Sequence, residues 1–195
     1  MVKTQLISTS ACNKLNKMIL KILVVIVSII AILLIIALFV KREYMISREI
    51  IINKPTFDVF NYIKYLKNQG NYNKWVMMDP NVRRTYNGTD GSTGFVATWD
   101  SDNKNVGKGE QEIKKITEGK RIDLEVRFEK PFKNTAKVYM ETEATSQNQT
   151  RVTWVMEGEN AYPLNLMNLF IPGMLGKDLQ TSLVNLKTVV EKDTN

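Results

Sequence analysis

A run of nineteen residues, Ile22–Val40, limits what this chain can fold into more than any other feature, because Ser28 is its only residue that is not apolar. As a helix with about 1.5 Å of rise per residue, the run spans roughly 30 Å, the thickness of the hydrocarbon core of a bilayer. Basic residues flank the run on both sides, and no acidic residue occurs before Glu43. We therefore predict a basic N-terminal flank over residues 1–21 and a transmembrane helix over residues 22–40, which attaches the chain to a membrane through Ile22 to Val40.

A cleaved signal peptide is the alternative interpretation of this run. The run is longer than the usual apolar region of a signal peptide, and no pattern of small residues typical of a cleavage site follows it near Phe39–Ser47. We favour an uncleaved, single-pass anchor. Four lysines and the amino terminus precede the run, which favours a cytoplasmic N-terminus and a domain outside the cytoplasm, although basic residues also follow the run closely.

The positive charge of the chain belongs mainly to this segment. The formal net charge is +7, yet residues 1–41 contain five lysines and no acid, and the rest of the chain carries 22 basic and 20 acidic residues. A nucleic-acid-binding domain concentrates its basic residues on one face of the folded domain. The charge distribution therefore predicts that nucleic acid is not a partner.

The composition excludes several kinds of active site. The chain contains no histidine, which rules out serine-histidine and cysteine-histidine nucleophiles and histidine-ligated metal sites. Its single cysteine, Cys12, cannot form an intrachain disulfide; palmitoylation is one interpretation of its position before the apolar run, and an incidental thiol is the interpretation we favour. Asp100–Asn105 resembles a calcium loop, but Asn105 stands where that loop needs glycine. We predict no metal site and no cofactor.

Beyond the anchor, several segments alternate between apolar and polar residues, which is typical of antiparallel strands with one face exposed to water. Arg121–Glu129 is the clearest of these, because Ile122, Leu124, Val126 and Phe128 alternate with charged residues. The other predicted strands are Tyr44–Ile52, Phe95–Trp99, Gln111–Ile116, Ala136–Met140 and Val152–Met156.

Helical spacing appears on both sides of the strands. Pro55 begins a predicted helix that ends before Gly70, and a short helix is expected around Tyr72–Met78. Leu175, Leu179, Leu183, Leu186 and Val190 form the apolar stripe of a long terminal helix. These elements predict an α+β domain in which the terminal helix covers a curved antiparallel sheet of six or seven strands.

The order of elements and several short segments resemble a known superfamily. The segments are Ile51–Pro55 leading into Val59-Phe60, Asn71–Trp75, Met78–Pro80, Gly107–Gln111 and Asp178–Leu186. They resemble the SRPBCC superfamily, with its START-like and Bet v 1-like helix-grip fold, and in particular its bacterial polyketide cyclase/dehydrase-like branch. The resemblance covers residues 44–191, implies a helix-grip domain over residues 44–193, and favours a bacterial cytoplasmic membrane as the location.

The resemblance implies an apolar cavity between the sheet and the terminal helix, which takes lipids, sterols, polyketides or other hydrophobic molecules. It supplies no catalytic motif, so no catalytic residue is predicted. The best candidates for the cavity wall are Phe95, Trp99, Leu124, Val126, Met140, Trp154, Met156, Leu175 and Leu179. The alternative for the same residues is that they only fill a core.

Three functions remain open from the sequence. The favoured one is a membrane-anchored binding module for a lipid-like or other hydrophobic small molecule. The second is a polyketide cyclase-like or hydrolase-like enzyme acting in the same cavity, which needs a polar side chain there; Glu110 and Glu112 are the acids whose strand face is undecided. The third is an interaction module with a closed core.

Overall fold

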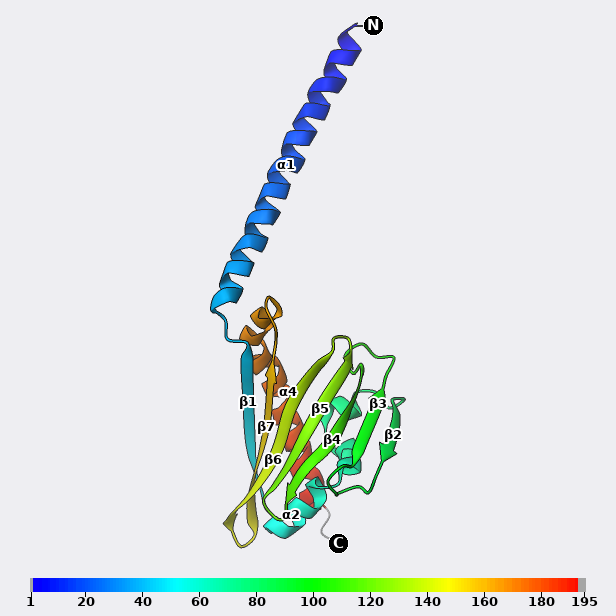
Figure 1. Cartoon of the computed structure of the whole chain (residues 1–195), viewed down its shortest axis with the longest axis vertical. Helices are drawn as coiled ribbons and strands as arrows, with labels where there is room; N and C mark the ends of the chain where they lie inside the picture. The colour runs from blue at the N-terminus through cyan, green and yellow to red at the C-terminus, as the bar shows by residue number, and fades with distance from the viewer. Residues whose placement is uncertain (1, 193–195) are drawn as a thin grey trace.

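The computed structural model describes residues 2–192 and the side chains of residues 15–192 (Figure 1). Cys12 lies outside the described side chains, and Asp193, the last residue of the predicted domain, lies outside the described residues. The predicted domain boundaries at residues 21/22, 40 and 44 stay predictions, because helix α1 (Val2–Phe39) runs without a break through the predicted basic flank.

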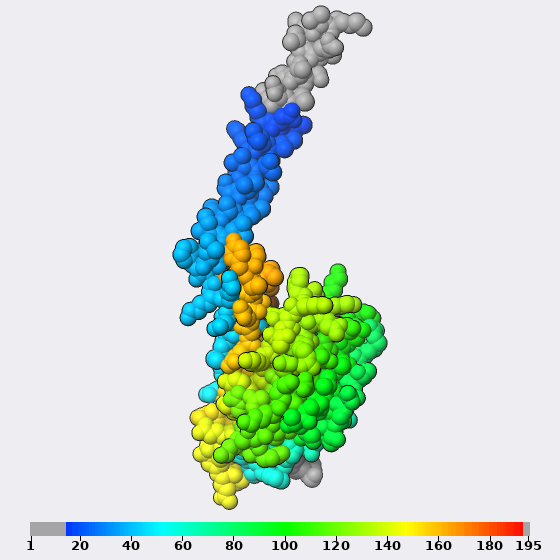
Figure 2. Space-filling view, in the orientation of Figure 1, coloured from blue at the N-terminus to red at the C-terminus, as the bar shows by residue number. Residues whose placement is uncertain are grey.

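Helix α1 stands clear of the rest of the molecule over most of its length (Figure 2). Its segment Leu15–Phe39 is long and apolar enough to cross a membrane, and nearly all of its side chains are exposed. The hydroxyl of Ser28 donates a hydrogen bond of 2.8 Å to the carbonyl of Val24, so the one polar side chain in the run has a partner inside the helix. A signal sequence shares this length and composition.

The domain is built on seven antiparallel strands in the order β1-β7-β6-β5-β4-β3-β2. The strands are β1 (Glu43–Ile52), β2 (Arg83–Asn87), β3 (Val96–Asp100), β4 (Lys108–Thr117), β5 (Arg121–Lys130), β6 (Asn134–Ser146) and β7 (Gln149–Glu159). Each of the six predicted strands is present, and the α+β fold is confirmed. Strand β2 was not predicted, since four of its five residues are exposed and show no alternation.

The alternation along β5 has the predicted consequence. Ile122, Leu124 and Val126 are buried on the inner face. On the outer face Arg127 forms ion pairs with Glu112 at 2.9 Å and with two further glutamates. The hydrogen bond from Arg127 holds the pKa of the Glu112 carboxyl below its ordinary value. One face of the sheet is therefore a core wall, and the other is a network of charges in water.

Helix α4 (Ile171–Lys192) packs along the inner face of the sheet (Figure 1). Leu179, Leu183 and Leu186 are fully buried, and each contributes about 1.5–3 kcal/mol of hydrophobic stabilisation. Pro172 and Gly173 both lie in the first turn of α4. A proline there removes no helical hydrogen bond, because the first N–H groups of a helix have no partner within it.

The segment between β1 and β2 closes the inner face. The helix predicted from Pro55 is divided into α2 (Thr56–Ile63) and a 3₁₀ helix η1 (Leu66–Asn71), and the short helix α3 spans Lys74–Met77. Asp90, from the connection after β2, accepts hydrogen bonds from the backbone N–H groups of Leu66 and Lys67. This tertiary cap explains why a new helical turn starts at Leu66.

The end of α1 is held by side chains from η2 (Leu164–Leu169), the 3₁₀ helix that precedes α4. The Asn165 amide donates to the carbonyls of Ala37 at 2.6 Å and Val40 at 2.8 Å, and the Asn168 amide donates to Lys41 and Arg42. We call Asn165 and Asn168 the asparagine clasp. The last carbonyls of a helix have no partner within the helix, and here the clasp supplies partners. The joint between α1 and the domain is therefore a structured contact.

Candidate functional site

A cavity of about 310 Å³ lies between the inner face of the sheet and the segments η1, α3 and α4. This volume falls at the lower end of the roughly 300–1,000 Å³ typical of small-molecule sites. Most of the wall is apolar. Its members are Tyr44, Leu66, Gln69, Gly70, Asn73, Trp75, Val76, Val82, Arg84, Tyr86, Ala97, Thr98, Trp99, Asn105, Val106, Gln111, Leu124, Val126, Phe128, Lys130, Pro131, Val138, Trp154, Met156 and Leu175.

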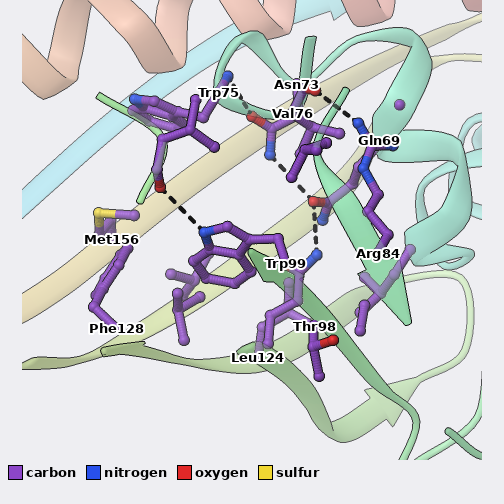
Figure 3. A pocket seen from close by; sticks show the side chains of 18 of the residues that line it. Gln69, Asn73, Trp75, Val76, Arg84, Thr98, Trp99, Leu124, Phe128 and Met156 are labelled. Carbon is purple, nitrogen blue, oxygen red and sulfur yellow. Dashed lines mark hydrogen bonds between the residues drawn. The ribbon is translucent and has the colours of Figure 1, made fainter. Parts of the chain in front are cut away.

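Trp99 crosses the middle of the cavity wall (Figure 3). Its indole N–H donates to the carbonyl of Val106 at 3.1 Å, and its ring meets Phe128 edge to face with centroids 6.0 Å apart. A Cβ atom on Gly109 would lie 2.6 Å from the indole ring, so only glycine at residue 109 leaves room for the ring. Gly109, at the start of β4, therefore leaves the space that the indole ring occupies.

A buried amide cluster forms the polar part of the wall. The carbonyl oxygen of the Gln69 side chain accepts hydrogen bonds from Asn73 at 3.1 Å and from Gln111 at 2.9 Å (Figure 3). Asn73 in turn accepts from the backbone N–H of Trp75 and thereby caps α3. These mutual bonds fix the orientation of the amides, so they present set donors and acceptors to the cavity.

Arg84 on β2 is the half-buried cation of the wall. Its guanidinium donates to the carbonyl of Val76 at 2.8 Å and lies against Gly70, where an added Cβ would be 3.3 Å from it. No Asp or Glu lines the cavity. The site can therefore orient a polar or anionic group, while its amides and arginine do not exchange protons near pH 7.

Two buried aromatic residues carry polar atoms that have no hydrogen-bond partner among the described residues. These atoms are the Tyr72 hydroxyl and the Trp154 indole N–H. Their rings meet edge to face at 6.1 Å. Burial raises the pKa of Tyr72 well above its ordinary value, so its phenol stays neutral at pH 7. Of the two, Trp154 lines the cavity.

Six of the nine residues predicted for the cavity wall lie together in it: Trp99, Leu124, Val126, Trp154, Met156 and Leu175. Phe95, Met140 and Leu179 lie in the surrounding core instead. Phe95 precedes β3 and stacks on Tyr86, whereas Met140 and Leu179 are buried farther along the inner face. Alternation reports which face a residue occupies but not its distance from the cavity. Their part in binding a ligand stays a prediction.

The polar members of the wall were missed by sequence reasoning. Gln69 lies in a 3₁₀ turn and Arg84 on the strand that showed no alternation, so neither carries a periodic signal. Glu110 and Glu112 lie on the outer face in the ion pairs of Arg127, away from the cavity. The suggestion that one of these two acids acts in the cavity is therefore wrong.

Four residues of the cavity wall are exposed: Tyr86 on β2, Asn105 after β3, and Lys130 and Pro131 at the β5–β6 turn. Strand register places this turn at the same end of the sheet as the start of β1, because Tyr44 pairs with Gly158 and Gly158 pairs with Ala136. Helix α1 joins the domain at this end (Figure 1). The cavity therefore reaches the surface mainly at the side of the domain from which α1 projects, with Tyr86 exposed on β2 as well.

The sequence matches the protein family described as polyketide cyclase / dehydrase and lipid transport over residues 45–191. No curated protein matches the chain in sequence.

Solved structures share the fold at low sequence identity. A Thermobifida fusca protein solved by NMR is 13% identical over 77% of this chain and 95% of its own, with a TM-score of 0.58. Norcoclaurine synthase from Thalictrum flavum, in complex with dopamine and hydroxybenzaldehyde, is 10% identical over 83% and 94% with a TM-score of 0.60. Ara h 8.0201 is 11% identical over 77% and 99% with a TM-score of 0.56. Identities this low establish the common fold and nothing about activity.

Proposed function

The chain belongs to the polyketide cyclase / dehydrase and lipid transport family of the SRPBCC superfamily, and on this premise we propose that it is a single-pass membrane protein whose domain binds a hydrophobic small molecule taken from the bilayer. One observation carries the proposal: three of the four exposed residues that line the cavity lie at the end of the domain where α1 is clasped. With α1 in a membrane, this end faces the lipid surface. A hydrophobic ligand would then pass from bilayer to cavity over a short path.

The surface around that end supports the proposal. Exposed large apolar side chains are grouped there on the β5–β6 turn and on the segment from η2 into α4: Phe132, Leu164, Met167, Leu169, Phe170 and Met174. Apolar patches on a protein surface mark contacts with membranes or other partners. Beside a helix with the length and composition of a membrane span, the fitting partner is the bilayer interface.

We propose an N-terminus in the cytoplasm and the domain on the outer side of a bacterial cytoplasmic membrane. The support is the group of lysines that precedes the apolar run, including Lys14, Lys17 and Lys21. Lys41, Arg42, Arg48 and Lys54 on the other side oppose this orientation, and the charge of the amino terminus tips the balance.

The cavity chemistry favours binding over catalysis. An enzyme of this fold needs a group in the cavity that moves a proton or attacks a substrate. The polar groups of the wall are amides, hydroxyls and two cations, and burial raises the pKa of the Tyr44 phenol further from neutrality. The third alternative, a closed core, predicts no void of ligand size and disagrees with a cavity of about 310 Å³.

The test is recovery of a ligand from the full chain. We expect the protein, extracted from membranes into nanodiscs, to carry a hydrophobic small molecule that mass spectrometry identifies. Val106→Trp fills the open end of the cavity and should reduce the bound molecule about tenfold, the order expected when a well-packed apolar contact is lost. Val184→Trp, on the exposed side of α4, is the matched control and should retain it.

The proposal fails if no molecule co-purifies and no fatty acid, sterol, isoprenoid or aromatic polyketide raises the unfolding temperature. It also fails if Val106→Trp and Val184→Trp retain the molecule equally.

A further inference from the structure

Two neighbouring arginines on β2, Arg83 and Arg84, have different surroundings. Arg83 points outward and pairs with Asp102 at 3.2 Å and with Asp100 at 3.4 Å. Arg84 lines the cavity, and its one hydrogen bond to a described residue is to the carbonyl of Val76. Because a guanidinium carries five N–H donors, most of the donor capacity of Arg84 is not taken up by the described residues.

Asp79, an acid whose charge interacts with Arg84, forms no ion pair with it. Asp79 accepts hydrogen bonds from the Ser101 hydroxyl and from the backbone N–H of Asn81. These bonds, more than the charges of Arg83 and Arg84, lower the pKa of the Asp79 carboxyl. No described carboxylate comes within ion-pair distance of Arg84, and none lines the cavity.

One wholly buried polar atom of the wall has no hydrogen-bond partner among the described residues, and it is a donor, the indole N–H of Trp154. By contrast, the side-chain oxygens of Gln69 and Asn73 already accept bonds from within the cluster. A buried donor left unmade costs free energy, so a wall with spare donors favours a ligand that brings acceptors.

Polar and apolar side chains of the inner wall lie on opposite sides of Trp99, and Lys130 is a second cation at the surface of the cavity. Gln69 and Arg84 lie to one side of Trp99, whereas Phe128 and Met156 lie to the other (Figure 3). Met156 belongs to β7, next to β1, so the apolar side is the one nearer to α1. A volume of about 310 Å³ suits one short acyl chain and is too small for a two-chain lipid.

We propose that the cavity binds a single-chain amphiphile with a carboxylate head, with Arg84 holding the head and the apolar side holding the tail. This inference rests on the proposed function and adds the chemical class of the ligand. The guanidinium fork matches a carboxylate in shape and charge. The tail then points toward the side of α1, and an acyl chain leaving a membrane enters head first.

Intrinsic fluorescence gives a direct assay, because all three tryptophans of the chain, Trp75, Trp99 and Trp154, line the cavity. The probes are 11-bromoundecanoate and 11-bromoundecanol, which share length and quencher and differ in the head group. They are titrated at pH 8 into the full chain in phosphatidylcholine nanodiscs, with partitioning measured on empty nanodiscs. We expect the carboxylate to quench at about tenfold lower concentration than the alcohol, as an added charge-assisted bond predicts.

Matched variants assign the preference to one residue. Arg84→Gln should weaken carboxylate binding about tenfold and leave alcohol binding within about twofold, whereas Arg83→Gln on the outer face should change neither. Arg84→Lys should keep part of the preference, because it keeps the charge and loses the fork. The unaltered chain should also bind an 11-bromoundecylammonium probe about tenfold more weakly than the carboxylate, a comparison that needs no variant.

The outcomes separate this inference from the proposed function. Equal binding of carboxylate and alcohol, or equal loss of both in Arg84→Gln, overturns the assignment of the head group and leaves a hydrophobic-ligand protein. Tighter binding of the ammonium probe also overturns it. Absence of quenching by every probe contradicts both proposals.

Discussion

Asn165 shows how one side chain can connect two parts of this molecule. It is almost completely buried, and its amide donates to two carbonyls at the end of α1. No N–H group of the helix donates to those carbonyls. Because the joint is buried, water does not easily take the place of the Asn165 amide as their donor. The amide therefore decides whether α1 and the domain move as one body.

We predict that Asn165→Ala loosens this joint while the sheet stays folded. The lost hydrogen bonds are worth about 1–3 kcal/mol locally, so backbone amides over residues 37–44 should exchange hydrogen roughly ten to a hundred times faster. Hydrogen–deuterium exchange of the full chain in nanodiscs measures the effect. Asn148→Ala in the exposed β6–β7 hairpin is the control, and unchanged exchange in Asn165→Ala would contradict the role of the clasp.

At the scale of elements, the segment from η2 into α4 combines two roles. Its inner side carries the clasp and the buried Ile171, and its outer side carries exposed apolar residues such as Leu169 and Phe170. A short element that only joined β7 to α4 would not need this outer side. We interpret it as the part of the domain that rests in the bilayer interface.

We predict that position 170 lies in lipid and position 57 does not. Phe170 and Phe57 are equally exposed, at 73% and 74%, but Phe57 lies on α2 at the opposite end of the sheet (Figure 1). In a Cys12→Ser background, an environment-sensitive fluorophore on Phe170→Cys should shift to the blue in nanodiscs and be quenched by brominated lipids. The same fluorophore on Phe57→Cys should show neither effect, and identical behaviour at both positions would exclude bilayer contact by this segment.

For the whole molecule, the clasp joins α1 to the domain in one orientation. The cavity opening, the apolar segment and α1 share one end of the sheet, and the charged outer face and α2 lie away from it (Figure 1). The ligand entry and membrane contact that we propose would thus depend on a single arrangement of α1 and the domain.

The proposed orientation of the whole molecule predicts that Phe57→Cys reacts from outside intact cells. A membrane-impermeant maleimide should label this variant in the Cys12→Ser background before permeabilisation, because the lysines before the apolar run keep the N-terminus in the cytoplasm. Labelling that requires permeabilisation would reverse the topology. Cys12 in the otherwise unaltered chain supplies the reverse control, since its labelling should require permeabilisation.

Several parts of the fold were readable in the sequence for physical reasons. A strand with one wet face must alternate, which identified β5, and a helix that covers a sheet must carry an apolar stripe, which identified α4. Within the apolar run of residues 22–40, all residues except Val40 lie in a single helix. Local hydrogen bonds satisfy the backbone of such a helix without distant partners.

Other features follow from contacts between distant residues. Strand β2 forms because it pairs with β3, and this pairing places Arg84 at the cavity. Gln69 bonds to Gln111, 42 residues away in the sequence, and Asn165 bonds to Ala37, 128 residues away. Periodicity reports only which side of an element is apolar. Which polar side chains converge, and at which end the cavity opens, depends on strand order and register, so the sequence determined the kind of cavity while tertiary pairing placed its polar groups and its opening.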